Sequence, residues 1–303
     1  MKFYLELIIL GLPTAGAFAL IATGVVMVYR ASRILTLAQG AVMMFTAYVL
    51  YQLNNDPAVF GGRGWGLPMF IALPGAIIFA AFMGFAIERF LLRPLRDRPV
   101  LVSVIMTVGV LAMLTAIAGI VWSYDRQEAP KVTPSGAVRF AGITLGVDRL
   151  FVLGVTIVIM FAVLYLFKYT TLGIAMRAVA DDRRAALLMG IPADRVSALT
   201  WIIGSILAGL AGILLSPLVQ LHPLLLTLTS IPAYAAALFG GLTNLGRMLI
   251  GAVVVGVLYS VVNSVSFLKD TEFPGYRELA IFMAVIIFMF VTGKTTQLQE
   301  EEI

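Results

Sequence analysis

The sequence has no cysteine, a single histidine (His222) and little charge. Without cysteine the chain has neither a disulfide framework nor thiol chemistry. One histidine argues against a zinc site of the usual kind, and we expect no metal site. Only 12% of the 303 residues are charged. A soluble domain exposes far more charge than this, so the composition excludes an ordinary soluble protein.

Apolar residues dominate instead. Hydrophobic residues make up 61% of the chain, and the mean hydropathy is +1.01. A helix needs about 20 apolar residues to cross a membrane, and runs of that kind fill most of the length. We therefore expect an all-α polytopic membrane protein, a single transmembrane domain over residues 1–303. No small-residue cleavage site follows the first run, which we interpret as a retained span.

The runs predict about nine crossings, with eight or ten as alternatives, some of them short or broken. Pro223 and Pro232 bracket one break. Repeated small residues such as Gly24, Gly204 and Gly209 predict close helix packing. The runs are 4–28, 34–53, 67–92, 100–122, 150–167, 198–219, 233–242, 248–267 and 278–291.

Basic residues set the expected orientation. The basic connections 30–33, 89–98 and 168–195, with Arg247 and Lys294, fall on one side of the membrane. The positive-inside rule places that side in the cytoplasm. We expect a bacterial inner-membrane protein with its N-terminus outside and its C-terminus in the cytoplasm. The main extracytoplasmic loop is then 123–149, and Glu88 and Arg89 lie in a tight basic cytoplasmic loop.

The segment 168–197 is polar although apolar runs flank it on both sides. Apolar residues recur in it at helical spacing, at Ile174, Val179, Ala185 or Ala186, and Met189. This spacing predicts one short amphipathic helix that ends at Gly190, before Pro192. A water-facing helix held between two spans suits contact with a cytoplasmic partner. The alternative is a solvated basic loop that only fixes topology.

Four stretches of the chain resemble the permeases of ATP-binding cassette importers for branched-chain amino acids. The segment RAVADDRRAALLMGI, from Arg177 to Ile191, followed by RVSALT, is similar to their cytoplasmic coupling loop. The other similar stretches are 34–48, 88–96 and 235–251. The coupling loop of ABC importers generally carries Glu-Ala-Ala, three residues and Gly. Here Ala185, Ala186 and Gly190 fit, but Arg184 replaces the Glu.

The resemblance implies a transport subunit that is not itself an enzyme. Its partners would be two cytoplasmic ATPase subunits, a second permease, identical or homologous, and an extracytoplasmic substrate-binding protein. ATP and Mg would be bound by the partner subunits, with no cofactor in this chain. The implied ATPase-coupling residues are Arg177, Asp181, Asp182, Arg183, Arg184, Ala185, Ala186 and Gly190.

Polar residues inside spans are candidates for a substrate pathway, because lipid-facing positions penalise them. Gln39, Thr107, Ser205, Asn263 and Ser264 qualify, although hydrogen bonds between helices would explain them equally well. No span carries an ionisable residue near its middle, which argues against a proton- or sodium-driven carrier.

Gly293, Lys294 and Thr295 end the last run like a phosphate-binding loop, but Phe288 occupies the position of its first glycine. ATP hydrolysis is therefore expected on another chain. Two alternative functions stay open. One is a stand-alone secondary carrier for a small organic solute. The other is an ABC permease for urea, amides or aromatic acids.

Overall fold

The computed structural model describes residues 2–56, 64–95, 98–130, 132, 136–140, 143–264, 280 and 282–283, and only the backbone of 2–9, 138–140, 143–145 and 263. Backbone amides cannot stay unpaired in lipid, so apolar runs fold into helices. Six helices are long and apolar enough to cross a membrane. The predicted helical, multi-pass membrane architecture is confirmed.

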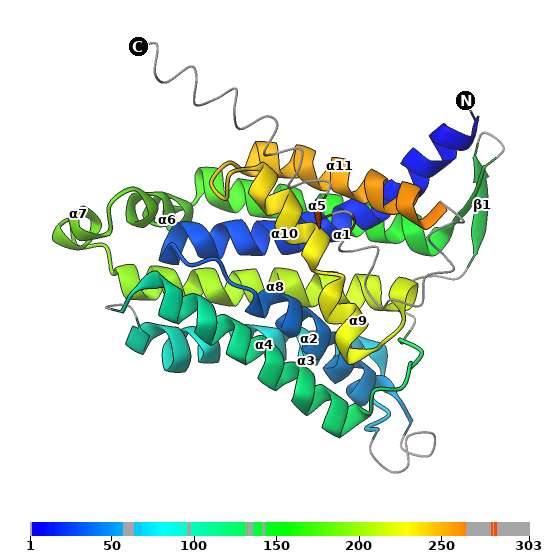
Figure 1. Cartoon of the computed structure of the whole chain (residues 1–303), viewed down its shortest axis with the longest axis horizontal. Coiled ribbons are helices and arrows are strands. Elements are labelled where there is room, and N and C mark those ends of the chain that lie inside the picture. The colour runs from blue at the N-terminus through cyan, green and yellow to red at the C-terminus, as the bar shows by residue number, and fades with distance from the viewer. Residues whose placement is uncertain are drawn as a thin grey trace.

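Six long helices and two shorter helical segments form the body of the molecule (Figure 1). The shorter segments are α2 (Ala38–Asn54) and the consecutive helices α9 (Pro223–Leu228) and α10 (Ile231–Phe239). Long apolar helices thus number six in the described residues, against the expected nine crossings. The expected run 278–291 lies outside the described residues. The long helices are α1 (Lys2–Ser32), α3 (Met69–Ala86), α4 (Val100–Trp122), α5 (Val147–Tyr169), α8 (Ala193–Val219) and α11 (Leu245–Ser264).

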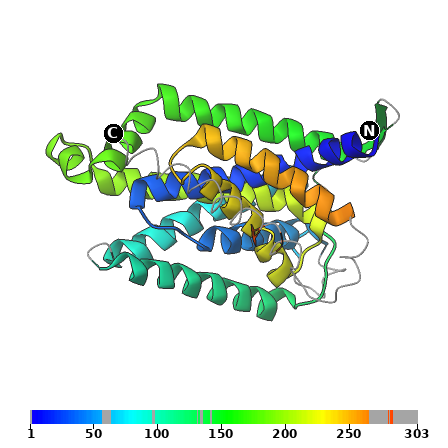
Figure 2. The same cartoon turned by 45° about the horizontal axis from the view of Figure 1, so that its top comes forward.

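Helices α1 and α8 form the centre of the bundle. α1 packs against α5, α8, α10 and α11, and α8 also contacts α2 and α3. Figure 2 shows α5 and α4 on opposite outer sides, with α1, α2 and α8 between them. Accordingly, large apolar side chains on α4 and α5 are exposed, among them Ile120 and Phe161, as suits a surface that faces lipid.

Small residues let the central helices approach closely, as the sequence predicts. A Cβ atom added to Gly24 of α1 would lie 2.8 Å from the carbonyl oxygen of Gly204 of α8. A Cβ on Gly11 of α1 would lie 2.9 Å from the carbonyl oxygen of Gly256 of α11. Both contacts join backbone to backbone, so only glycine fits at these crossings.

The end of α3 differs from the expectation. Glu88 and Arg89, predicted in a loop, continue the helix through a π-helical turn, η1 (Ile87–Leu92), and a 3-10 turn, η2 (Arg93–Leu95). The Glu88 side chain is 1% exposed. Charged residues in sequence suggest the end of a span, but a buried carboxylate can stay in a helix where it faces protein. π-helical turns are rare and are frequently found at functional sites.

The opposite end carries the predicted loop 123–149, which is folded where it is described. β1 (Ala137–Phe140) pairs with β2 (Ile143–Gly146) in an antiparallel hairpin. The backbones of Gln127 and Leu221 exchange hydrogen bonds of 2.9 and 3.0 Å, which tie this loop to the turn between α8 and α9. The predicted break between Pro223 and Pro232 is confirmed, and Thr229 and Ser230 form it.

Candidate functional site

The segment 168–197 lies at the end of the molecule opposite the hairpin (Figure 1). Its residues 170–192 bend away from the bundle, and we call them the elbow. It contains α6 (Thr171–Asp181) and α7 (Arg183–Leu188), and it joins α5 to α8. The Thr170 hydroxyl caps α6 by accepting from the Gly173 amide at 3.2 Å. Asp182 caps α7, because its Oδ1 accepts from the amides of Arg184 and Ala185 at 2.7 and 3.0 Å.

The prediction of a single amphipathic helix is wrong. Asp182 adopts an extended backbone between two helices, which changes the direction in which later side chains point. Val179 and Ala186 are buried as expected, but Ile174 is 55% and Met189 82% exposed. The predicted end of the helix is correct. Gly190 has φ +80°, and the Ile191 amide donates to the Ala186 carbonyl at 2.9 Å, as in a Schellman motif.

Three of the predicted coupling residues hold the elbow in place. Arg177 donates to the Phe167 carbonyl at the end of α5, and Asp182 caps α7. Arg183 pairs with Asp194 at 2.6 Å, and the other oxygen of Asp194 pairs with Arg93 at 2.5 Å. This ion-pair cluster joins α7, α8 and the end of α3. Its members Arg93 and Asp194 were not among the predicted site residues.

The outer surface of the elbow carries the other predicted coupling residues. Asp181, Arg184, Ala185 and Gly190 are exposed, whereas Ala186 is buried beneath them. Beside them lie three exposed apolar side chains that were not among the predicted coupling residues, Leu187, Leu188 and Met189 at 50%, 89% and 82%. We call these three residues the apolar tip. The sequence signal for this arrangement is Asp182. An aspartate directly before a short helical stretch is typical of a helix N-cap and would have predicted a separate helix here.

Two of the predicted pathway residues, Gln39 and Thr107, lie at the start of α2, and Ser205 follows Gly204 in the adjacent helix α8. Gln39 is fully buried, and its amide nitrogen lies near Gly204. Its side chain has no hydrogen-bond partner in the described structure, and neither has the Ser205 hydroxyl. The Thr107 hydroxyl accepts from the Leu37 amide at 3.4 Å, so helix–helix hydrogen bonding explains this residue at least in part.

The structure does not place the other two residues, Asn263 and Ser264, near the start of α2. Ser264 lies at the opposite end, where it donates to the Ser260 carbonyl at 2.8 Å and lines a cavity of about 380 Å³ with Arg149 and Thr229. The side chain of Asn263 lies outside the described residues. Of the five predicted residues, three therefore lie in the interior and Ser264 lies at the opposite end of the bundle.

Known proteins resemble the chain along almost its whole length. The permease protein BraD of Pseudomonas aeruginosa, from a high-affinity branched-chain amino acid transport system, is 27% identical over 95% of this chain and 94% of its own. The permease protein LivH of Salmonella typhimurium is 29% identical, and that of Escherichia coli 28%, over the same shares. A family model described as "Branched-chain amino acid transport system / permease component" matches residues 7–292. The chain belongs to this family of permease components.

Proposed function

We propose that the chain is a permease subunit of an ATP-binding cassette importer, and that it carries branched-chain amino acids into the cell. Two separate ATPase subunits bind ATP and Mg and hydrolyse the nucleotide. A second permease, identical or homologous, completes the membrane part, and an external binding protein delivers the substrate. This proposal takes its substrate from the relatives named BraD and LivH, which match the chain from end to end.

The observation that carries the proposal is the apolar tip. Leu188 and Met189 are the most exposed large apolar residues of a capped elbow that projects beyond the bundle. Exposed apolar residues rimmed by charge are typical of protein–protein contact sites, and Arg184 and Asp181 supply that rim. We infer that the apolar tip enters a groove of an ATPase subunit and that the exposed charges surround the contact.

The elbow connects such a contact to the membrane region. α6 follows α5 directly, and α7 leads through Gly190 and Pro192 into α8, the helix that carries Ser205 and lies beside Gln39. Movement of the docked elbow therefore tilts α8 against α2 and α3. We propose that this tilt opens the buried polar group around Gln39 to one side of the membrane and then to the other.

We further propose the orientation and the number of crossings. Helix ends that carry Arg30, Arg93 and Lys168 gather with the elbow at one end of the bundle, and the positive-inside rule makes this end cytoplasmic. Counting α2, the α9–α10 pair and the run 278–291 with the six long helices gives nine crossings and a cytoplasmic C-terminus.

Two variants at the apolar tip test the proposal. Leu188→Glu and Met189→Glu each put a charge on the contact surface while the elbow keeps its caps. We expect the ATPase subunits to co-purify poorly with either variant and substrate-stimulated ATP hydrolysis to fall at least about tenfold. Trp65→Glu, at a residue 65% exposed elsewhere on the chain, is the matched control and keeps the complex intact.

Uptake assays separate the remaining candidates. ATP-dependent leucine uptake that needs a binding protein supports the proposal, whereas uptake by the chain alone supports a secondary carrier. Competition by urea, short amides or aromatic acids, with no effect of leucine, would assign a different substrate to the same machinery. Normal coupling in both tip variants would contradict the role given to the elbow.

A further inference from the structure

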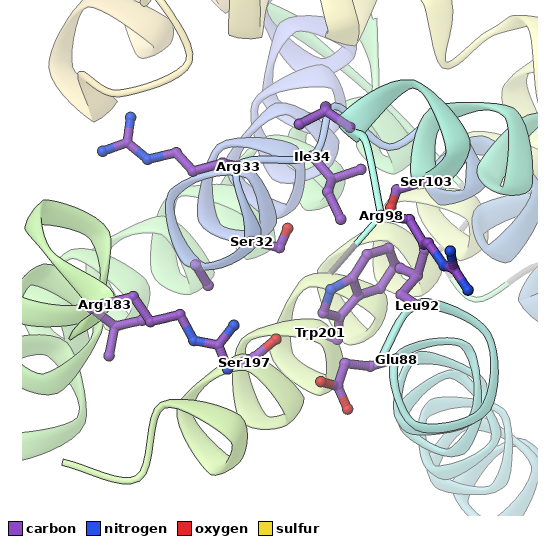
Figure 3. A pocket seen from close by; sticks show the side chains of 13 residues that line it. Ser32, Arg33, Ile34, Glu88, Leu92, Arg98, Ser103, Arg183, Ser197 and Trp201 are labelled. Atoms are coloured by element: carbon purple, nitrogen blue, oxygen red, sulfur yellow. The ribbon is translucent and has the colours of Figure 1, made fainter. Parts of the chain in front are cut away.

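A small cavity lies where the elbow meets the bundle. We call it the inner cavity; its volume is about 130 Å³, and it is lined by the end of α1, η1, the start of α4, α6, α7 and α8. Pockets for drug-sized ligands begin at about 300 Å³, so this cavity suits a molecule smaller than a typical drug. Figure 3 shows Arg183 and Glu88 pointing toward the space beside Trp201 and Ser197.

The buried side of the inner cavity is polar. Glu88 and Trp201 are each 1% exposed, and Ser103 and Ser197 are 2% and 4% exposed. The Trp201 Nε1–H group finds no hydrogen-bond acceptor within the described structure. A buried donor without an acceptor costs about 1–3 kcal/mol, and natural proteins avoid it unless water or a ligand completes the bond.

Arginine side chains also line the inner cavity. Arg183 reaches the cavity while one of its nitrogens holds Asp194 at 2.6 Å. Arg98 lines the cavity too, whereas Arg33 donates to the Ala180 carbonyl at 2.5 Å. Figure 3 shows Arg98 beside Leu92 on the side of Glu88, so the cavity has the Glu88 carboxylate on one side and the Arg183 guanidinium on the other. Ile34, Leu92 and Val179 add apolar surface.

We propose that the inner cavity binds an α-amino acid with a small apolar side chain from the cytoplasmic side. The Glu88 carboxylate accepts hydrogen bonds from the ammonium group, and Arg183 and the Trp201 indole N–H donate to the ligand carboxylate. Ile34 and Leu92 contact the side chain. This inference rests on the proposed function for the sidedness of the cavity and for the class of ligand.

The site has a consequence for transport. Glu88 belongs to the end of α3, and Arg183 belongs to α7, so one ligand connects the bundle to the elbow. A ligand that connects two elements stabilises the arrangement in which both contacts form. Amino acid accumulated in the cytoplasm therefore resists movement of the elbow and slows ATP hydrolysis.

Tryptophan fluorescence measures binding directly. The chain has three tryptophans, so Trp65→Phe with Trp122→Phe leaves Trp201 as the only reporter in the full-length permease. We expect leucine to change its emission in a saturable way. 4-Methylpentanoate, which lacks the ammonium group, and 3-methylbutylamine, which lacks the carboxylate, should bind about tenfold or more weakly.

Two further variants locate the site. Glu88→Gln in the single-tryptophan background should weaken leucine binding about tenfold or more, and Arg183→Gln gives a second test if Glu88→Gln fails to fold. Arg149→Gln, in the cavity at the other end, is the control and leaves the titration unchanged. Equal binding of phosphate or 4-methylpentanoate would overturn the proposal in favour of a plain anion site, and no response to leucine would overturn it outright.

Proteoliposomes separate this inference from the proposed function. The assembled transporter is given binding protein and leucine outside, with or without leucine at the elbow side. We expect leucine at the elbow side to lower ATP hydrolysis in the wild type and to lose this effect in Glu88→Gln. Normal uptake without any such inhibition would refute the regulatory effect alone, whereas absence of leucine uptake would count against the proposed function.

Discussion

Asp182 determines the shape of the elbow with a single carboxylate. Its Oδ1 accepts hydrogen bonds from the amides of Arg184 and Ala185 at the start of α7, and its own extended backbone separates α7 from α6. A helix of six residues has little stability of its own, so the cap and the contact of Ala186 with the bundle must hold it.

Asp182→Ala removes both capping bonds, and Asp182→Asn keeps an oxygen at the same place. We expect the alanine variant to lose about 1 kcal/mol locally, which frays α7 and reduces substrate-stimulated ATP hydrolysis several-fold. The asparagine variant should stay close to wild type. The measurement is ATPase activity of the assembled complex together with size-exclusion profiles; equal activity in both variants would mean that the cap plays no part in coupling.

His222 caps a helix at the other end of the molecule. Its Nδ1 accepts from the amides of Leu224 and Leu225 at 3.2 and 3.3 Å, which requires the ring to be neutral. Burial lowers the pKa of His222 below its usual 6.5, Arg126 lowers it further, and Asp125 opposes the shift. The unfolded chain therefore binds this proton more readily than the folded chain does.

The contribution of His222 to stability is present above about pH 6.5 and is lost as the pH falls through the lowered pKa. His222→Asn keeps a capping oxygen but does not titrate. We expect the thermal midpoint of the wild type to fall relative to that of His222→Asn between about pH 7 and pH 5. Parallel curves for the two proteins over this range would show that the cap is insensitive to protonation.

At the crossing of α1 and α8 the two backbones leave no room for a side chain at Gly24. Gly24→Leu would drive a side chain into the backbone of Gly204, so we expect little folded protein by size-exclusion chromatography in detergent. Gly154→Leu is the control, because nothing lies within 4 Å of a Cβ at Gly154 of α5, and it should fold normally. Equal yields of folded Gly24→Leu and Gly154→Leu would mean that α1 and α8 can move apart without loss of stability.

The ion-pair cluster of Arg93, Arg183 and Asp194 connects three elements but contributes little to stability. Its side chains are 36–40% exposed, and such pairs are worth about 0–1 kcal/mol. Asp194→Asn should therefore leave the thermal midpoint within a few degrees of wild type. It should still uncouple ATP hydrolysis from substrate, because α7 loses its link to α8 and α3. Asp125→Asn, in the outer loop, is the control; coupling unchanged in Asp194→Asn would exclude the link.

The orientation of the whole molecule can be tested because the chain has no cysteine. Arg184→Cys and Tyr124→Cys each introduce one thiol at an exposed position, in the elbow and in the outer loop respectively. In intact cells we expect a membrane-impermeant maleimide to label Cys at 124 and not at 184. Inverted membrane vesicles should give the opposite result, and the reverse pattern would place the elbow outside.

Sequence reasoning succeeded where one physical rule decides the outcome. Length and hydropathy predicted the long helices, and paired glycines such as Gly24 and Gly204 predicted the close crossings. It failed where a local contact overrides periodicity. A carboxylate cap at Asp182 broke the expected helix, and a π-helical turn kept Glu88 inside the bundle. The pairing of Arg93 with Asp194 joins residues 101 apart, and no local pattern encodes it.

The burial of α1 has a consequence for biosynthesis. This helix is translated before the other described helices, yet 83% of its most apolar window is buried inside the bundle that those helices complete. Until α8 and α11 arrive, the glycine faces at Gly11 and Gly24 have only lipid or the insertion machinery as neighbours. A nascent chain that stops before α11 therefore leaves the Gly11 face without the Gly256 backbone on which it packs in the complete bundle.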